Sequence, residues 1–424
     1  MVIWNSWWHF AYIIQLILVK LIYFISLLNS NLGRKFNARR AFEQRNSDSS
    51  ITSFDVGFHV SSEGELSQIY SLLEYFLDKK LSVLLLFTSP SVESKIGKLR
   101  EVYPDLVTRS VVFTKVDYKF LSNLRMKNFS LCRYDFLPWL MLLGLKTEQF
   151  FLINATSIKW RGSSFFVKKL KNLFYLQFDL ITTSSAVDED IFSKLLPDKR
   201  ILNIDLRSLE VKKRQAIFTQ SDFYKMNEEF LLRIKKEENT FCFGSAWGKD
   251  LKVMMNGHVT ELFKKADSFI FVFPHDLDEK NIVSIKRDLF SFGYELNIIS
   301  RVDEFRMSKP GVINLVLIKG VLCELYPFFK FVIVGGGFGA SVHSVLEPML
   351  GGCITFCGPI VHRSTEVENF VSKFPSRMFV CSDTESLAHQ LTKCTDGKKN
   401  KFTVNDGFDQ ITSRFSSLVG FYES

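Results

Sequence analysis

Two segments of the chain carry residues whose types and spacing suit ligand binding or acid–base chemistry. The first is GGGFGASVHSVLEP, residues 335–348, which follows the apolar run FKFVIV. Glycines at such a turn let backbone N–H groups approach a phosphate, and a helix predicted from about Ser341 would add positive charge at its N-terminus. His343 and Glu347 would share one face of that helix, with Glu347 accepting from ribose hydroxyls. A tight turn that needs glycine, followed by a surface acid, explains the same residues, and both interpretations stay open.

The second segment is FHVSSEGELSQ, residues 58–68, where a predicted strand again runs into a turn and a helix. Glu63 and Glu65 would lie at the carboxyl end of that strand, where open α/β sheets place their ligands. A carboxylate there can take the proton of an attacking hydroxyl as a general base. Both acids would also favour the positive end of the helix dipole without any catalytic role.

The elements that must position these segments alternate between short apolar runs and amphipathic stretches. This alternation predicts parallel sheets flanked by helices, and hence an α/β fold. The predicted strands fall into two sets: FDVGFHV, LSVLLLFTS, RSVVFTKV, FSLCRYD, EQFFLIN and FDLITTSS in the first; TFCFGSA, DSFIFVFPH, ELNIIS, GVINLVLI, FKFVIVGGG, CITFCG and RMFVCS in the second. Two such halves are typical of the GT-B architecture of sugar-nucleotide transferases, in which two Rossmann-like domains face each other across a cleft. Other two-domain α/β proteins share the pattern.

The two sets of strands set the predicted domain boundaries. We expect a membrane-anchor helix at 1–32, an N-terminal acceptor-binding domain at 33–190, a helical and charged interdomain segment at 191–240, and a C-terminal nucleotide-sugar-binding domain at 241–424.

The anchor prediction rests on the 22 apolar-rich residues 7–28, which as a helix would reach about 33 Å, close to the thickness of a bilayer core. Lys20 near the middle of this run would be costly in lipid, so a helix lying in the membrane interface is the alternative. A buried amphipathic helix is a third interpretation. Basic residues follow the run, which the positive-inside rule assigns to the cytoplasmic side: Arg34, Lys35, Arg39, Arg40 and Arg45.

The composition bounds the classes of function. With 424 residues, 46% apolar and 23% charged, the chain is long enough for two globular domains and is not a disordered protein. The net charge of +9 favours anionic partners. The 7 cysteines form no CxxC pair, which argues against structural zinc and a disulfide framework. Asp276 and Asp278 form a D-x-D by spacing, yet they follow the Pro-His at residues 274–275, which is not a convincing strand-end context for a metal site.

Beyond these general features, FHVSSEGE resembles the H-x-x-S-x-G-E motif of the Kdo transferases, enzymes that add 3-deoxy-D-manno-oct-2-ulosonic acid (Kdo) to the lipid A precursor. The resemblance covers roughly residues 33–365 and continues in chain order through ARRAFEQR, FTSPSVES, LREVYPDLV, VDYKF, FDLITTSS, GSAWGKD, the Pro-His of FVFPHDLDEK, KGVLCELYPFFKFVIVGG, GGGFGASVHSVLEP and FCGP.

The resemblance implies roles for individual residues. Glu65 matches the catalytic base, whereas Glu63 stands where the family is usually apolar. A site for cytidine monophosphate (CMP) is implied for Gly244, Ser245, Gly336, Gly337, Gly339, His343, Ser344 and Glu347. Ser62 and Asp135 are implied on the acceptor side, with a surface or capping acid as the alternative for Asp135.

Three departures from the family pattern put nucleotide affinity and acceptor specificity in doubt. Ser344 occupies the position where Asn is common, and Thr156 the position of a common Arg. The segment that contains Asp205 and Arg207 lacks the usual Gly.

The implied function is inverting transfer of Kdo from CMP-Kdo to a lipid A precursor in lipopolysaccharide biosynthesis. The resemblance implies no metal ion and no cofactor, and anionic inner-membrane lipid as a partner, with the catalytic domains on the cytoplasmic face of the cell inner membrane. Two alternatives remain: a membrane-associated GT-B transferase that uses another nucleotide sugar, and a non-catalytic nucleotide-binding member. Nucleic-acid binding is disfavoured because no RNP, KH, zinc-finger or basic-aromatic pattern is present.

Overall fold

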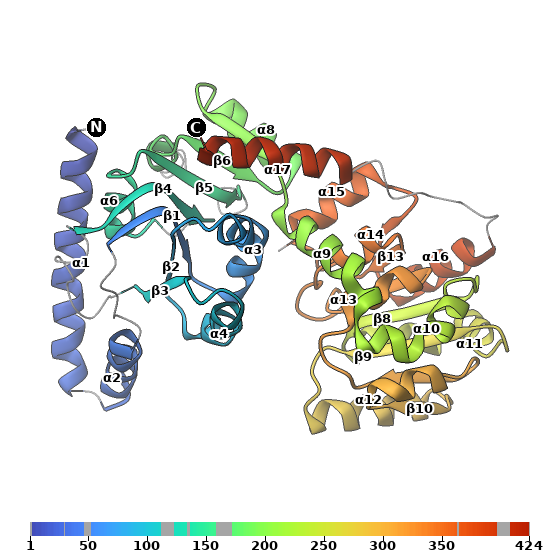
Figure 1. Ribbon diagram of the computed structural model, residues 1–424. Coiled ribbons are helices and arrows are strands. Elements are labelled where there is room, and N and C mark those ends of the chain that lie inside the picture. Colours follow the sequence, from blue (N-terminus) through green and yellow to red (C-terminus); the bar gives the residue numbers. More distant parts are fainter. Residues whose placement is uncertain are drawn as a thin grey trace. The chain divides into compact units, whose positions relative to one another are not determined.

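The computed structural model describes residues 2–28, 30–45, 52–111, 123–133, 136–157, 172–362, 364–396 and 408–423. The chain forms two compact units (Figure 1): Met1–Arg207 with Ile411–Ser424, and Ser208–Gln410. Each unit contains a seven-stranded sheet of described strands, and all pairs of neighbouring strands run parallel. The prediction of an α/β fold with two parallel sheets is confirmed.

The sheet of the first unit has the order β3-β2-β1-β4-β5-β6-β7. Its strands are β1 (Ser53–Val60), β2 (Val83–Phe87), β3 (Val107–Ser110), β4 (Arg125–Cys132), β5 (Gln149–Ala155), β6 (Leu180–Thr183) and β7 (Arg200–Asn203). The helices around it are α1 (Val2–Leu28), α2 (Ser30–Arg45), α3 (Glu63–Asp78), α4 (Glu93–Val102), α6 (Pro138–Gly144), α8 (Ala186–Leu195) and α17 (Phe408–Glu423), with the short helix η1 (Pro90–Val92).

The sheet of the second unit has the order β10-β11-β9-β8-β12-β13-β14. Its strands are β8 (Thr240–Ala246), β9 (Phe269–Pro274), β10 (Leu296–Ile299), β11 (Ile313–Val316), β12 (Phe331–Val334), β13 (Ile354–Cys357) and β14 (Met378–Val380). The helices are α9 (Leu206–Ile217), α10 (Asp222–Ile234), α11 (Gly257–Phe263), α12 (Glu279–Ser291), α13 (Leu322–Leu325), α14 (Leu346–Gly351), α15 (Thr365–Lys373) and α16 (Thr384–Asp396), with the short helices η3 (Phe218–Gln220), η4 (Asp250–Met255), η5 (Val302–Met307) and η6 (Tyr326–Phe328).

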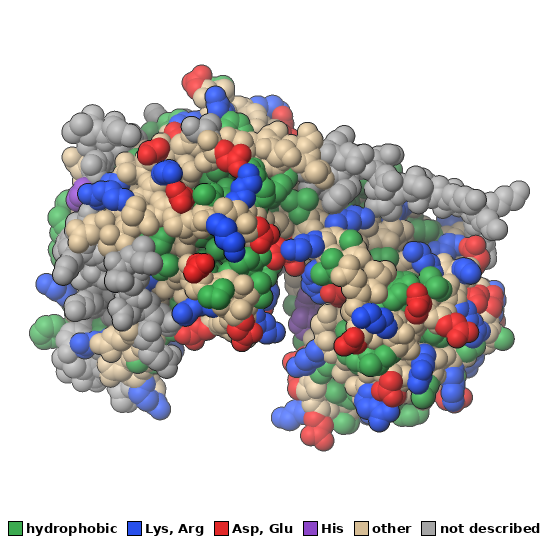
Figure 2. All heavy atoms as spheres, in the orientation of Figure 1, with side chains coloured by type: hydrophobic (Ala, Val, Ile, Leu, Met, Phe, Trp, Pro, Cys, Tyr) green, Lys and Arg blue, Asp and Glu red, His purple; other side chains and the backbone are tan. Residues whose placement is uncertain are grey.

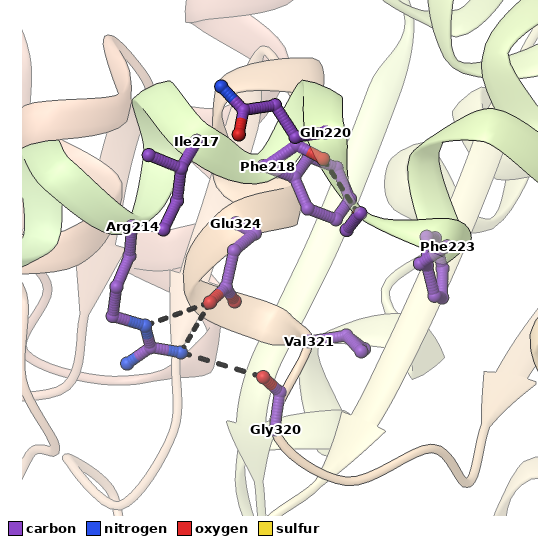
Figure 3. Close-up of a pocket in the computed structure, with 9 residues that line it drawn as sticks. Arg214, Ile217, Phe218, Gln220, Phe223, Gly320, Val321 and Glu324 are labelled. Atoms are coloured by element: carbon purple, nitrogen blue, oxygen red, sulfur yellow. Dashed lines mark hydrogen bonds and ion pairs between the residues drawn. The ribbon is translucent and has the colours of Figure 1, made fainter. Parts of the chain in front are cut away.

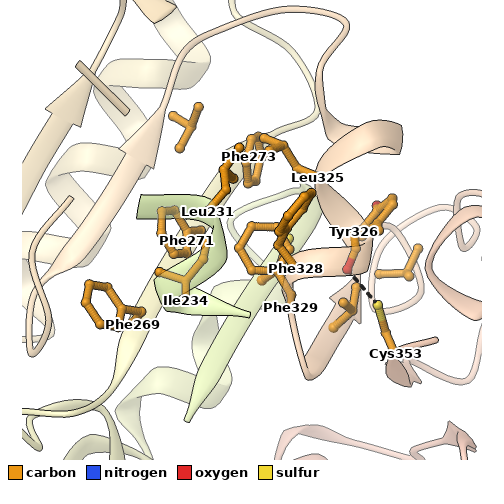
Figure 4. Packing of buried hydrophobic residues seen from close by; sticks show 14 of the residues in the cluster. Leu231, Ile234, Phe269, Phe271, Phe273, Leu325, Tyr326, Phe328, Phe329 and Cys353 are labelled. Carbon is orange, nitrogen blue, oxygen red and sulfur yellow. Dashed lines mark hydrogen bonds between the residues drawn. The ribbon is translucent and has the colours of Figure 1, made fainter. Parts of the chain in front are cut away.

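Phenylalanine fills much of the core of the second unit. Phe269, Phe271 and Phe273 alternate along β9 and point to one face of the sheet, because successive side chains of a strand point to opposite faces. They pack there with Leu231 and Ile234 of α10, and Phe328 and Phe329 join the same cluster (Figure 4). Ile270 and Val272 of β9 belong to a separate cluster. Both faces of this sheet are therefore covered, which explains why its strands are continuous apolar runs in the sequence.

The last helix, α17, belongs by its contacts to the first unit, although the sequence prediction assigned it to the second domain. Leu418, Val419 and Tyr422 are buried. The hydroxyl of Tyr422 lies 2.5 Å from Ser130 Oγ on β4, and Asn128 Nδ2 donates to the Tyr422 carbonyl at 2.9 Å. The boundary between the two units falls between residues 207 and 208, so the predicted interdomain segment 191–240 is divided between them.

The N-terminal segment forms α1, which packs on the first unit next to α6 and α2 (Figure 1). Trp8 and Tyr12 of α1 are part of the core of this unit, so one face of the helix is buried against protein. No helix among the described residues is long and apolar enough to cross a membrane. The membrane-anchor helix expected at 1–32 stays a prediction.

Arg39 attaches α2 to the first sheet. Its guanidinium donates to the backbone carbonyl of Thr88, to that of Val111 at 3.0 Å and to Glu43 at 2.7 Å. Arg39 is therefore a structural residue, whereas Arg34, Lys35 and Arg40 of the predicted basic patch are exposed.

Candidate functional site

The predicted glycine loop lies at the carboxyl edge of the second sheet, where β8, β9 and β12 end side by side. Backbone hydrogen bonds join the three strand ends. Gly335 N donates to Gly244 O at 2.9 Å, His275 N donates to Ala246 O at 3.0 Å, and His343 N donates to Gly335 O at 3.1 Å. The structure thus brings Gly244 and Ser245 next to the glycine loop and His343, although the two segments are far apart in the chain.

Glycine is required in this loop because neighbouring backbones approach one another closely. A Cβ on Gly335 would lie 2.1 Å from the carbonyl oxygen of Ser245, and one on Gly337 would lie 2.5 Å from the amide nitrogen of Gly358. Gly336 has φ +89°, a conformation that residues with a Cβ rarely adopt. Gly244 is needed because a Cβ there would meet the Tyr326 hydroxyl at 2.3 Å. Packing alone therefore explains these glycines, and their number is not by itself a phosphate signature.

Asp250, on η4, fastens the loop to the end of β8. Its Oδ2 accepts from the amides of Trp247 and Gly336, each at 2.9 Å. The side chain is 1% exposed, and desolvation raises its pKa despite these backbone hydrogen bonds. This buried acid holds the backbone of Gly336 in place.

Three rings stack beside the glycine loop. The imidazoles of His275 and His343 are 4.0 Å apart at 15°, and the Trp247 ring lies 4.8 Å from His275. Trp247 Nε1 donates to His343 Nε2 at 3.2 Å. Burial, with a smaller contribution from His275, lowers the pKa of His343 to about 4, so this imidazole is neutral at pH 7.

The helix expected from about Ser341 begins later than the sequence suggests, and this corrects part of the predicted site. The helix α14 begins at Leu346 and has 6 residues, so His343 precedes it and cannot share a helix face with Glu347. The predicted contribution of a helix N-terminus at Ser341 is lost. The run ASVHS before Leu346 stays non-helical because His343 N and Val342 N bond to Gly335 O and Ile360 O instead of to helix carbonyls.

The remaining predicted nucleotide residues spread around the loop. Ser344 Oγ donates to Glu366 Oε2 of α15 at 3.3 Å. Gln215 of α9 donates to the backbone carbonyl of Glu347 at 3.3 Å. Gly339 has no tight packing contact, so packing does not require glycine there. Ser341 Oγ is buried and has no hydrogen-bond partner in the part of the chain that the structure describes, as expected for a group that meets a ligand.

The predicted base, Glu65, lies in the first unit at the third position of α3. Its Oε2 accepts from Ser61 N at 2.6 Å and from Ser61 Oγ at 2.7 Å, while Ser62 Oγ accepts from Glu65 N at 3.3 Å. These reciprocal bonds resemble a capping box. The residue is only 5% exposed. The carboxylate is thus fixed in one orientation just after β1, which suits either a helix cap or a positioned base.

The other acids of the prediction have ordinary roles or lie outside the described residues. Glu63 is exposed and pairs with Lys95 at 3.0 Å. Asp278 caps α12 by accepting from Asn281 N at 2.7 Å, which explains the D-x-D spacing without a metal ion. Asp135 lies outside the described residues. Among those described, no cluster of three or more His, Cys, Asp or Glu side chains could hold a metal ion.

A pocket of about 440 Å³ lies in the second unit and was not predicted (Figure 3). It is lined by residues of α9 and η3 on one side and by Gly320, Val321 and Glu324 on the other. Arg214 donates to Glu324 Oε1 at 2.8 Å and also contacts the Gly320 carbonyl at 3.5 Å. One of its lining residues, Gly320, lies in the segment that follows β11. Phe218 and Phe223 give it an apolar wall.

Sequence reasoning named the motifs that contain Trp247, Asp250 and His275 without giving these residues a role. The signal for Asp250 was present, because a single acid that follows a strand and precedes a short helix is a common backbone acceptor. No sequence signal places Arg214 against Glu324, because 110 residues separate them.

No protein-family model matches the chain. Its fold nevertheless has counterparts among solved structures. A UDP-GlcNAc 2-epimerase from Neisseria meningitidis, bound to UDP-GlcNAc, matches with a TM-score of 0.55 at 10% identity, covering 86% of this chain and 100% of that one. A glycosyltransferase from Rickettsia africae matches with a TM-score of 0.50 at 11% identity, covering 82% and 89%. With the two parallel sheets, these likenesses define a GT-B type of α/β fold.

The sequence comparison narrows this class. The chain is 25% identical over 346 residues to the 3-deoxy-D-manno-octulosonic acid transferase of Aquifex aeolicus, covering 80% of this chain and 86% of that protein. The chain is therefore a relative of the Kdo transferases, and the resemblance seen in its motifs is confirmed.

Proposed function

We propose that this protein is an inverting, metal-independent glycosyltransferase that moves Kdo from CMP-Kdo to a hydroxyl of a lipid A precursor. The observation that carries the proposal is the sequence relationship to a Kdo transferase over 346 residues. The fold alone does not carry it, since an epimerase shares the same architecture.

The second unit would bind the nucleotide. The loop at 335–341 would take the CMP phosphate, and its backbone is already fixed by Asp250 and by the ends of β8 and β12. A preorganised loop of this kind stabilises the leaving phosphate without reorganisation during the reaction, an effect that can supply several kcal/mol. The buried Ser341 hydroxyl is a further group that a bound nucleotide would satisfy.

The first unit would supply the base. The Glu65 carboxylate would accept the proton of the acceptor hydroxyl as that oxygen attacks the anomeric carbon, while the bond to the CMP phosphate breaks. Ser61 supports this role because its two hydrogen bonds hold Glu65 Oε2 in a fixed position. The proposal requires that, with donor and acceptor bound, Glu65 comes within hydrogen-bond reach of the acceptor hydroxyl.

The test compares Glu65→Gln with the matched control Glu63→Gln, two residues away and exposed in its ion pair with Lys95. Each protein is incubated with CMP-Kdo and tetra-acylated lipid A precursor, and the product mass is measured. Wild type and Glu63→Gln should add Kdo at similar rates, whereas Glu65→Gln should be slower by about 10²–10⁴-fold. A Glu65→Gln variant that transfers as fast as wild type would falsify the assignment of the base.

The two alternative functions give different results in this transfer assay combined with nucleotide-binding calorimetry. A transferase for another nucleotide sugar would bind UDP more tightly than CMP in calorimetry and would leave the lipid A precursor unchanged. A non-catalytic member would bind CMP but show no transfer with any variant. The number of added sugars, read from the product mass, also gives the multiplicity of transfer.

We further propose that the protein associates with the anionic inner membrane through α1 lying in the interface. Large apolar side chains of α1 are exposed, among them Phe10, Ile17 and Leu21. Hydrophobic side chains are visible in green at places along the left side of Figure 2, where Figure 1 draws α1. The exposed cations of α2, Arg34, Lys35 and Arg40, would attract anionic headgroups at about 1 kcal/mol each.

Sedimentation with anionic phosphatidylglycerol vesicles tests this association. Ile17→Asp, at a side chain 59% exposed on α1, should reduce binding about tenfold or more. Phe290→Asp, at a side chain 60% exposed on α12 of the second unit, is the matched control and should bind as wild type. Equal binding by both variants would rule out α1 as the contact.

A further inference from the structure

His343 is held by two neighbours from other segments of the second unit. His275, from the loop after β9, stacks on one face of its imidazole, and Trp247, just after β8, donates to its Nε2. The Cδ2 edge of the ring lies beside the glycine loop, because a Cβ on Gly336 would be 3.2 Å from His343 Cδ2. The orientation of the imidazole is therefore fixed at the loop.

The hydrogen bond from Trp247 decides where the proton of His343 sits. An indole N–H can only donate, so Nε2 of His343 must carry the lone pair that accepts. In a neutral imidazole the other nitrogen then carries the hydrogen. The pKa of about 4 keeps the ring neutral at pH 7, which is consistent with a single tautomer. His343 thus presents Nδ1 as an N–H donor, and this nitrogen has no protein partner among the described residues.

We propose that Trp247 is a positioning residue which fixes His343 in the Nδ1–H tautomer, so that Nδ1, on the edge of the ring opposite Cδ2, donates to an oxygen of a ligand that binds beside the glycine loop. This inference rests on the proposed nucleotide site for the identity of the ligand, a phosphate oxygen. The tautomer also determines the class of ligand. An Nδ1 that carries hydrogen has no lone pair for a metal ion or for an N–H donor, whereas it suits an anionic acceptor.

The indole is suited to this role because its N–H cannot reverse direction. A hydroxyl or an amide at the same place could donate or accept, and would leave both tautomers of His343 accessible. Trp247 is 38% exposed, so replacing it should leave the core of the unit intact. Phenylalanine keeps a ring for the stack and removes only the donor, while leucine removes both.

The test measures the tautomer directly in the full chain. Long-range ¹H–¹⁵N correlation spectra of ¹⁵N-histidine-labelled protein, assigned with His343→Gln, report which ring nitrogen carries hydrogen. Wild type should show a protonated Nδ1 and an unprotonated Nε2. Trp247→Phe and Trp247→Leu should both show a mixture of tautomers. Calorimetry with CMP should then give a Kd about 3- to 10-fold higher for both variants than for wild type, the effect of weakening one hydrogen bond.

The outcomes separate this inference from the proposed function. Hydrogen on Nε2 in the wild type would overturn the inference. So would a Trp247→Phe variant that keeps the wild-type tautomer and affinity while Trp247→Leu loses them, because stacking would then be the cause. If the wild type shows the Nδ1–H tautomer and Trp247→Phe loses it, yet CMP does not bind at all, the role of Trp247 stands and the choice of nucleotide fails.

Discussion

Replacing Asp250 with alanine should loosen the glycine loop and destabilise the second unit. Asp250 Oδ2 is the acceptor for two backbone amides, those of Trp247 and Gly336. Alanine leaves both N–H groups without this acceptor in a place where Asp250 itself is 1% exposed. Each orphaned buried donor costs about 1–3 kcal/mol.

The magnitude follows from these two amides. Their combined cost is about 2–6 kcal/mol, and the lower half of that range is expected because the buried carboxylate itself carries a desolvation cost, seen in its raised pKa. A loss of about 3 kcal/mol corresponds to a fall in melting temperature of about 6–12 °C for a domain of roughly 200 residues.

Calorimetric melting and hydrogen exchange of the peptide that contains Gly336 are the two measurements. Asp250→Asn is the control, since its amide oxygen can occupy the position of Oδ2 and accept both hydrogen bonds. Asparagine keeps the acceptor for both amides but buries an NH2 group where Oδ1 has no partner among the described residues, so it should destabilise less than alanine and keep slow exchange at Gly336. An Asp250→Ala protein that melts within about 1 °C of wild type, with unchanged exchange at Gly336, would show that Asp250 does not hold the glycine loop in place.

Three further predictions concern the first unit. His59 is fully buried, and desolvation lowers its pKa from 6.5 to about 3. Between these two pH values only the unfolded state takes up a proton on this residue. As the pH falls through this range, urea unfolding should show that wild type loses about 1.4 kcal/mol of unfolding free energy per pH unit relative to His59→Leu. Tyr422→Phe should cost about 1 kcal/mol by leaving the Ser130 hydroxyl unpaired, and Tyr422→Ala about 3–5 kcal/mol by opening a cavity; equal losses would show that α17 is not anchored through this ring. Arg39→Ala should lower the melting temperature because two backbone carbonyls lose their donor, while the exposed Arg40→Ala should not, and identical melting curves would contradict the structural role of Arg39.

Several elements were predictable from sequence because their signals are local. The strand that contains Phe269, Phe271 and Phe273 is a continuous apolar run, since a parallel sheet covered on both faces imposes that pattern on each of its inner strands. The start of α3 was also visible, because Ser62 and the acids that follow are common at helix N-termini. By contrast, the edge strand β7 was missed within a charged and mostly helical stretch, where its four residues range from the exposed Arg200 to the buried Asn203.

Some features of the candidate site were likewise predictable from the sequence, and others depend on the tertiary structure. The residue types of the glycine loop and the collinear motifs by themselves indicated a relative of the Kdo transferases and named Glu65 and His343. The late start of α14, the tether from Asp250 to Gly336, the stack of Trp247, His275 and His343, and the return of α17 to the first unit depend on segments far apart in the chain. Contacts of this kind are set by how strand ends and side chains meet in three dimensions, and no periodicity or spacing in the sequence records them.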